Sequence, residues 1–470
     1  MGDRPRTVSI DMLNDDSLLH VFYLYRPLFT DEDDTAEWRY KGRWWYALVH
    51  VCQRWRNIVL GSATYLDLSL LCTYGTPVTD MLAHSPPLPL VVGYFQRTRE
   101  LTTEDEEGII LALKQHDRIR RVRLGNSFAI IQKFILAMDE ECPILEFLHI
   151  MHPIEDNTTI SRFPETFQAP RLRHLTLRSF ALPIGSRLLT TAVGLVTLNL
   201  VMVHPSTYFH PNTLIRWISL MPQLETLGII LKFSIPNRDV ERQLTHTPII
   251  APITLPNLHS LRFTGVSNYL EALVHRITTP RLKELLIAFS NQLTFSVPRL
   301  LQFITAAENF RLGNAVLTFS DNIVSTGVYP YGGTNVYAFS MVVKCHPLDW
   351  QASSMAQISN SLSQIFSAVE RLVLQHEVHS ESSEEHNDVD PTEWRKLLRP
   401  FSNVNTLRIE EGLVKDLSHC LELEDGGLRL ELLPKLVRLE YFGRGDTRDA
   451  FNSFVDARRN AGHPIILVRL

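Results

Sequence analysis

Histidine, cysteine and the acidic residues are the side chains of this chain that could bind a metal ion or support nucleophilic catalysis. His376 and His379 stand three residues apart in a polar run that extends to His386, a spacing compatible with metal binding. From residue 377 to residue 390 the run is rich in aspartate and glutamate and lacks lysine and arginine, which is typical of a flexible, solvated loop. We therefore interpret residues 377–390 as an acidic loop, and we predict no metal site and no cofactor.

Motifs of nucleotide-binding and hydrolytic enzymes are missing from the sequence. It contains no G-x-x-x-x-G-K-[ST], H-E-x-x-H or G-x-S-x-G, and Gly443 and Gly445 form a bare G-x-G without a third glycine. The five cysteines favour reduced thiols in a cytoplasmic or nuclear protein, because they are scattered, odd in number and without a C-x-x-C pair. We expect no enzymatic activity; the alternative is an unrecognised catalytic site in a deep pocket.

Length and composition are those of a folded, soluble protein. A chain of 470 residues is too long for one compact core, unless the architecture grows by repeating units. Hydrophobic residues make up 45% and charged residues 21%, and the formal net charge of -5 argues against a nucleic-acid partner. No apolar run is long enough to cross a membrane, so we expect neither nucleic acid nor membrane as a partner.

An apolar pattern of the form L-x-x-L-x-L recurs along most of the chain. Seven occurrences begin at residues 119, 145, 172, 195, 224, 258 and 282, with spacings of 26, 27, 23, 29, 34 and 24 residues, and three more begin at 369, 404 and 436. Spacings of this size are typical of leucine-rich repeats. In six units a proline two residues before the first apolar position marks the turn into the strand, at Pro143, Pro170, Pro222, Pro256, Pro280 and Pro434.

Stripes of apolar residues at helical spacing, such as the one that begins at Leu214, separate the predicted strands. Strand and helix in alternation predict an α/β fold in which helices pack on the outside of a curved parallel sheet. The pattern blurs between residues 289 and 349, where we expect strands only at Val316–Phe319 and Val336–Phe339. A last strand is expected within Pro464–Leu470.

Positions three and five of each unit alternate with the core positions, so their side chains are expected to point onto the concave face of the sheet. The face is basic at its start and polar through its middle, which suits a protein or peptide partner, because arginine and aromatic residues dominate binding energies. The alternative is that these are solvated strand positions without a partner. The candidate target-binding residues are Arg121, Arg123, Phe147, His149, His174, Asn199 and Arg262.

Two amphipathic helical segments are predicted before the repeats. The first is capped by Asn14 or Asp15 and carries an apolar stripe from Leu18 to Phe22. The second forms one or two short helices up to Gly61 and is followed by a short strand or extended stretch at Tyr65–Leu68. Its apolar face consists of Trp45, Leu48, Cys52, Trp55 and Val59.

These segments resemble an F-box, most closely that of the F-box-like proteins of basidiomycete fungi. Asn14 stands where the family usually has proline, and the linker Tyr23–Arg43 is longer than usual. The resemblance implies docking on the Skp adaptor of a Skp–cullin–F-box ubiquitin ligase. The residues that match the motif, and that would face or support the adaptor, are Leu13, Leu18, Val21, Phe22, Val51, Cys52 and Trp55. The repeats resemble the degenerate leucine-rich repeats that follow many F-boxes, without asparagine at the ninth position.

The resemblance divides the chain into three parts. It implies an F-box-like helical domain (8–71), a connector with the first strand or cap of the repeat domain (72–117), and a leucine-rich-repeat-like solenoid (118–470). It also implies a non-catalytic substrate receptor that tethers a target protein to the ligase. A non-ligase repeat scaffold with a drifted F-box is the alternative, and periodicity alone would equally fit a plain helical subdomain.

Overall fold

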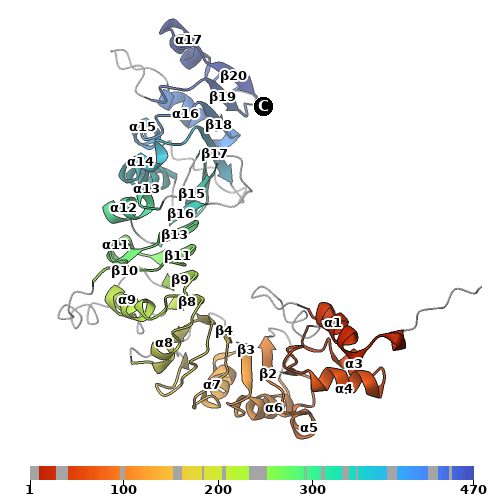
Figure 1. Ribbon diagram of the computed structural model, residues 1–470. Coiled ribbons are helices and arrows are strands. Elements are labelled where there is room, and N and C mark those ends of the chain that lie inside the picture. The colour runs from red at the N-terminus through yellow and green to blue at the C-terminus, as the bar shows by residue number, and fades with distance from the viewer. Residues whose placement is uncertain are drawn as a thin grey trace, which may run out of the picture. The chain divides into compact units, whose positions relative to one another are not determined.

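The computed structural model forms two compact units, Met1–Leu195 and Val196–Leu470, and each is described by itself (Figure 1). Within the described residues the chain is a mixed α/β protein with fifteen α-helices and a large, mostly parallel sheet of sixteen strands. The described residues are 10–27, 41–95, 101–151, 161–182, 185–203, 208–231, 251–290, 292, 294–307, 313–330, 338–345, 348–377, 389–421, 432–443 and 447–470.

The first unit begins with short helices, as predicted. A 3-10 helix, Ile10–Met12, precedes α1 (Asp15–Tyr25), and α3 (Tyr46–Val49) and α4 (Gln53–Gly61) follow. Asn14 is the N-cap of α1, since its side-chain oxygen accepts a hydrogen bond of 2.8 Å from the Ser17 amide. The expected strand at Tyr65–Leu68 is wrong: residues 62–67 form turns, and Asp67 has a φ of 56°, which ends any extended backbone there.

Five parallel strands of the large sheet belong to the first unit, and they neighbour one another in chain order. The sheet starts at Leu70, just before the region 72–117 that was predicted to contain the first strand or cap of the repeat domain. The strands are β1 (Leu70–Thr73), β2 (Leu90–Phe95), β3 (Ile119–Gly125), β4 (Phe147–Met151) and β6 (His174–Arg178). The helices between them are α5 (Val78–His84), α6 (Thr103–Leu113), α7 (Phe128–Leu136) and α8 (Arg187–Thr191), and β5 (Ser161–Arg162) pairs with β7 (Phe180–Ala181) separately.

The second unit continues the alternation of strand and helix, and Figure 1 shows its helices on one side of the strands. Its parallel strands are β8 (Thr197–Val203), β9 (Thr226–Leu231), β11 (Ser260–Gly265), β13 (Glu284–Ser290), β17 (Arg371–Glu377), β18 (Thr406–Ile409), β19 (Arg438–Tyr441) and β20 (Ile466–Arg469), the last as predicted. Its helices are α9 (Pro211–Ser219), α11 (Ser267–Val274), α12 (Pro298–Thr305), α13 (Leu348–Ser361), α14 (Ser363–Phe366), α15 (Pro391–Leu398), α16 (Val414–Leu421) and α17 (Asn452–Asn460). A 3-10 helix, Glu411–Leu413, leads into α16, and β10 (Ile253–Thr254) pairs with β12 (Ile277–Thr278).

Where the sequence pattern blurs, three strands lie in the sheet in the reverse of their chain order, and the middle one, β15 (Ile323–Tyr329), runs antiparallel to its two neighbours. The strands β14 (Asn314–Ser320), β15 and β16 (Phe339–Lys344) insert in reverse, so that β13 is followed by β16, β15, β14 and β17. The prediction of an all-parallel sheet is wrong here, because two residues between β14 and β15 permit only an antiparallel hairpin. The predicted strand at 316–319 lies within β14, whereas 336–337 lie outside the described residues and β15 was not predicted.

Each strand of the repeat is entered through the same turn. In nine units the amide of the first apolar residue donates to the carbonyl three residues earlier, at 3.0–3.4 Å, as Leu145 does to Cys142 and Leu436 to Leu433. The prolines predicted to mark strand entry occupy the second position of six of these turns, where their fixed φ favours the turn. The prediction is confirmed, and its cause is local turn chemistry.

The core follows the predicted pattern closely. All three apolar positions of the ten L-x-x-L-x-L units are buried, with exposed fractions of 0–3%. The apolar stripe of α9 is buried too, and so is that of α12. The interior of each unit is therefore one leucine-rich layer between the strands and the helices.

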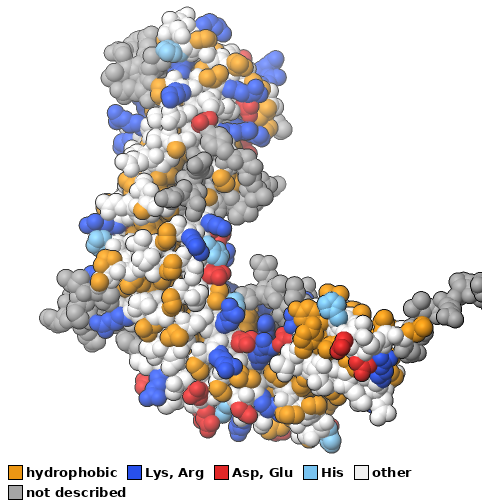
Figure 2. Space-filling model, viewed as in Figure 1, with side chains coloured by type: hydrophobic (Ala, Val, Ile, Leu, Met, Phe, Trp, Pro, Cys, Tyr) orange, Lys and Arg blue, Asp and Glu red, His pale blue; other side chains and the backbone are white. Residues whose placement is uncertain are grey.

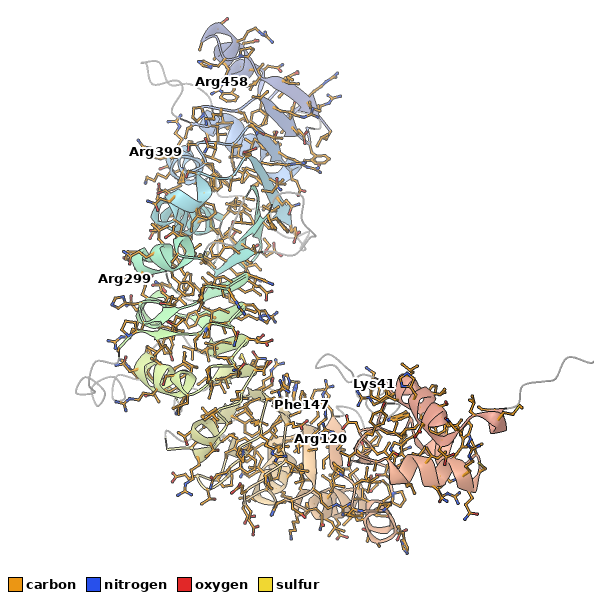
Figure 3. All side chains as sticks on the ribbon, viewed as in Figure 1. Lys41, Arg120, Phe147, Arg299, Arg399 and Arg458 are labelled. Atoms are coloured by element: carbon orange, nitrogen blue, oxygen red, sulfur yellow. The ribbon has the colours of Figure 1, made fainter. Side chains whose placement is uncertain are left out.

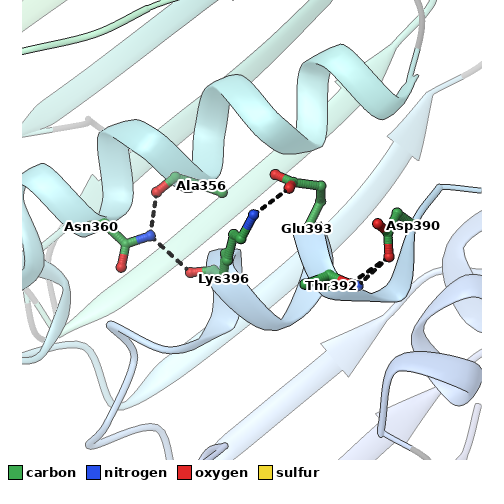
Figure 4. Close-up of polar contacts among 6 residues, drawn as sticks. All are labelled: Ala356, Asn360, Asp390, Thr392, Glu393 and Lys396. Carbon is green, nitrogen blue, oxygen red and sulfur yellow. Dashed lines mark hydrogen bonds and ion pairs between the residues drawn. The ribbon is translucent and has the colours of Figure 1, made fainter.

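Polar contacts close the packing of α13 against α15 (Figure 4). The Asn360 side-chain amide donates to the carbonyls of Ala356 at 2.7 Å and Lys396 at 3.1 Å. Asp390 is the N-cap of α15 and accepts hydrogen bonds from the Thr392 hydroxyl (2.6 Å) and amide (2.8 Å), which lower the pKa of its carboxyl group. Of the predicted acidic loop (377–390), Glu377 belongs to β17 and Asp390 caps α15, and residues 378–388 lie outside the described residues.

Candidate functional site

One side of α1 is buried against α4. Leu18 and Phe22, one helical turn apart, are 0% and 1% exposed, and the Phe22 ring lies 4.8 Å from the half-buried Trp55 ring. The Arg54 guanidinium donates to the half-buried Leu13's carbonyl at 2.5 Å and pairs with Asp15 at 2.8 Å, which joins the start of α1 to α4. Of the predicted adaptor-binding residues, Leu18, Phe22 and Trp55 thus support the fold of this segment.

Other motif residues reach the surface. Val21 is 47% and Val51 58% exposed, and Cys52, the N-cap of α4, is exposed as well. Leu24 (70% exposed) and Tyr25 (57% exposed) lie on the same side of α1 as Val21, because they follow it by three and four residues. Figure 2 shows hydrophobic side chains gathered over α1. Eight of the sixteen large apolar residues exposed among the described residues lie between 10 and 65: Ile10, Met12, Val21, Tyr23, Leu24, Tyr25, Val51 and Tyr65.

An ion-pair cluster ties these helices to the strands of the same unit. Arg120, labelled in Figure 3, donates to the carboxylates of Asp67 and Glu146, the latter at 2.9 Å, and Arg26 lies 3.5 Å from Asp67. Burial would lower the pKa of the Arg120 guanidinium, but the hydrogen bonds and charges of the two carboxylates outweigh it and raise the pKa. Two arginines and two carboxylates thus balance one another where the helices meet β3 and β4.

The strand positions that alternate with the core form the strand face of the first unit, which bears five of the predicted target-binding residues. Register places Arg121, Phe147 and His174 side by side on β3, β4 and β6, and Arg123 beside His149 two residues farther along. The fourteen positions of this strand face are Leu71, Thr73, Val91, Gly93, Phe95, Arg121, Arg123, Gly125, Phe147, His149, Met151, His174, Thr176 and Arg178.

Aromatic rings hold the arginines of this face in fixed positions. The Arg123 guanidinium lies 4.9 Å from the centre of the Phe95 ring, and that of Arg121 lies 6.0 Å from the Phe147 ring. The Phe95 ring occupies the space over Gly125 that a Cβ atom would fill, so glycine is required there. His149 stacks on Phe147 at 6.3 Å and meets Phe95 edge-on at 6.0 Å, which completes a connected cationic and aromatic cluster.

Part of this face is covered, which the alternation of residues did not predict. Phe147 is 4% exposed and forms an apolar cluster with Leu71 and Val91, and Arg123 is 9% exposed. Gly42 packs directly over Leu71, and the Trp45 indole donates to the Ser69 carbonyl at 3.1 Å. The N-terminal segment therefore covers the edge of the strand face at β1, and the half-buried Arg121, His149, His174 and Arg178 lie beyond it.

The strand face of the second unit has a different charge pattern. Arg262 lies 3.5 Å from the Glu284 carboxylate, which also accepts a hydrogen bond of 2.5 Å from Ser260, and Arg438 pairs with Glu440 at 2.6 Å. The side-chain amide of Asn199 lies over Gly228, and a Cβ atom at position 228 would collide with this amide. Of the two predicted residues here, Arg262 is part of an ion pair, and Asn199 lies in the same row of the sheet, with Gly228 between them.

The candidate metal ligands and nucleophilic thiols lie apart from one another in the described part of the chain. No group of three or more histidine, cysteine, aspartate or glutamate side chains there could hold a metal ion. Burial raises the pKa of the Cys72, Cys142 and Cys420 thiols to about 12, so these thiols stay protonated and unreactive at neutral pH. None of the described helices has the length and apolar character needed to cross a membrane.

Some residues of these surfaces were missed by the sequence analysis. Leu24 and Tyr25 extend the exposed side of α1 but lie outside the family motif, although their spacing from Val21 was a usable signal. Phe95 and Arg178 complete the strand face, because β2 pairs with β3 and β6 extends beyond the L-x-x-L-x-L pattern.

Comparison with known proteins adds nothing to this picture: the chain matches no protein-family model and no curated protein.

Proposed function

We propose that this protein is a non-catalytic substrate receptor of a Skp–cullin–F-box ubiquitin ligase. In this proposal the helices around α1 form an F-box-like module that docks on the Skp adaptor and through it on the cullin. The parallel strands form degenerate leucine-rich repeats that hold a target protein. By binding the adaptor and the target protein at the same time, the chain would raise the effective concentration of the target at the ligase.

The observation that carries the proposal is the exposed apolar side of α1, with Val51 between α3 and α4. Exposed apolar groups cost free energy in water, and their concentration in one segment indicates an interaction site. Leu18, Phe22 and Trp55 hold α1 on α4, which leaves Val21, Leu24 and Val51 available to a partner. The strand faces support the second half of the proposal, since arginine and aromatic residues are the usual anchors of a protein interface.

Binding of the purified adaptor to the full chain, followed by titration calorimetry, tests the proposal. Val51→Glu should weaken binding at least about tenfold, because a charge would enter an apolar interface. Val193→Glu is the matched control, since Val193 is exposed to a similar extent (50%) in the same unit but lies outside the helical segment. Circular dichroism should show that both variants are folded.

A non-ligase repeat scaffold with a drifted F-box is the second candidate. Asn14 favours it, because this position usually carries proline in the family and here serves as a helix cap. Native protein that fails to bind the adaptor at micromolar concentrations would favour the scaffold. Equal loss of binding in both glutamate variants would show that the contact does not involve the helical segment.

A further inference from the structure

The strand face of the first unit carries basic residues without acidic ones. Its fourteen positions include three arginines and two histidines, and none of the fourteen is aspartate or glutamate. Figure 2 shows lysine, arginine and histidine side chains gathered over β3 and β4. Glu146, next to Phe147 in sequence, and Asp67 are engaged by Arg120 and Arg26.

From this charge pattern we propose that the strand face of the first unit binds an acidic segment of a partner protein, in which several aspartate or glutamate side chains alternate with apolar ones. The proposal rests on the function proposed above and names the class of target. Arginine guanidinium groups pair with carboxylates through charge-assisted hydrogen bonds. The Phe147 ring already orients the half-buried Arg121, so little side-chain entropy of this arginine is lost on binding.

The spread of the cations favours several carboxylates over one phosphate group. Arg121, His149 and Arg178 lie on three neighbouring strands and on three successive rows of the face. From strand spacing and rise per residue, this area measures about 10 Å by 13 Å, larger than a single phosphate group. The strands β3, β4 and β6, which lie beyond the covered edge, together span about 10 Å, which about three residues of extended peptide would cross. Apolar side chains of such a peptide would meet Met151 and the aromatic rings between the charges.

Fluorescence anisotropy on the full chain tests the proposal with a labelled peptide of about eight residues that alternates glutamate with leucine. Binding is expected, and it should weaken as salt is added, because salt screens the charges. The same peptide with glutamine in place of glutamate should bind at least about tenfold more weakly. A peptide with one phosphoserine and glutamine elsewhere should also bind more weakly than the glutamate peptide.

Variants locate the binding surface. Arg121→Gln with Arg178→Gln should weaken binding of the glutamate peptide at least about tenfold. The matched control is Arg262→Gln on the strand face of the second unit, which should leave the affinity unchanged. Circular dichroism and binding of the adaptor should be the same in all variants, so that a folding defect or failure of the docking module is seen separately.

Three results would overturn the proposal. They are the absence of binding up to about 1 mM glutamate peptide, tighter binding of the phosphoserine peptide, and an equal loss of affinity in Arg262→Gln. If the peptide fails to bind while the adaptor still does, the inference about the target class is wrong and the proposed docking function stands. If the adaptor alone fails to bind, the opposite holds.

Discussion

The strand faces of the two units are built on the same core but differ in how their charges are arranged. In both units leucines at the same three positions of the repeat are fully buried beneath the strands. On the first unit's face Arg121 and Arg123 stack on phenylalanine rings. On the second unit's face Arg262 and Arg438 pair with glutamates, and Arg408 lies over the Phe442 ring. The repeat therefore determines the scaffold, while the residues between its leucines determine what each face can bind.

The largest expected effect tests whether the two cores are equivalent. Leu148→Ala in the first unit and Leu261→Ala in the second should each lower the free energy of unfolding by about 2–5 kcal/mol, because both side chains are 0% exposed and leave a cavity. Urea denaturation measures this change. A much smaller loss in one unit would show that its core is less tightly packed, and the comparison of equal scaffolds would fail.

The ion pairs of the two units should differ in strength. Arg120→Gln should lower the free energy of unfolding by about 1–2 kcal/mol, because the Arg120 side chain is only 24% exposed and its loss removes a charged partner from both Asp67 and Glu146. Arg262→Gln should cost less than about 1 kcal/mol, because Arg262 is 55% exposed and water screens its pair with Glu284. Equal losses in urea denaturation would contradict this difference.

Helix caps provide a comparison that depends on pH. Asn14→Ala in the first unit should cost about 0.5–2 kcal/mol at every pH, because the cap is a neutral amide. The Asp390 cap of the second unit is ionised, and the Thr392 hydrogen bonds lower its pKa below the ordinary value of 3.8. Its stabilisation is therefore present above pH 3.8 and is lost as the pH falls through the lower pKa of the folded state.

Asp390→Asn separates the charge of this cap from its hydrogen bonds, because asparagine still caps a helix. The variant should be less sensitive to acid than the native chain when thermal unfolding is followed from pH 6 to pH 2. If the unfolding temperature of the variant falls between pH 6 and pH 2 as steeply as that of the native chain, other carboxylates dominate the pH dependence.

The smallest effect is expected from a substitution that makes the charge pattern of the second unit's strand face more like that of the first. Glu284→Gln removes the carboxylate beside Arg262 and should raise binding of the glutamate peptide to the second unit by less than about threefold, because no aromatic ring among the described residues orients the Arg262 guanidinium as Phe147 orients that of Arg121. Anisotropy should be measured in a chain that also carries the Arg121→Gln and Arg178→Gln changes. A gain as large as the loss caused by those two changes would mean that ring stacking adds little to the first face.

The sequence by itself determined the repeating core, the turns into the strands and a helix cap at Asn14 or Asp15. These features depend on local periods of two and 3.6 residues, on proline's fixed φ and on the side chain of a single capping residue, so they can be predicted from neighbouring residues. For the same reason the positions of the strand-face residues were predicted correctly within each strand.

Only the tertiary structure decided the reversed order of β14, β15 and β16 in the sheet, the start of the sheet at Leu70, and the packing of Gly42 over Leu71. It also decided which residues of the helical motif are buried and which reach the surface, and that Arg123 lies on Phe95, a residue from another strand. These features depend on pairing and packing between segments far apart in the chain, and the period of any single segment contains no information about its neighbour.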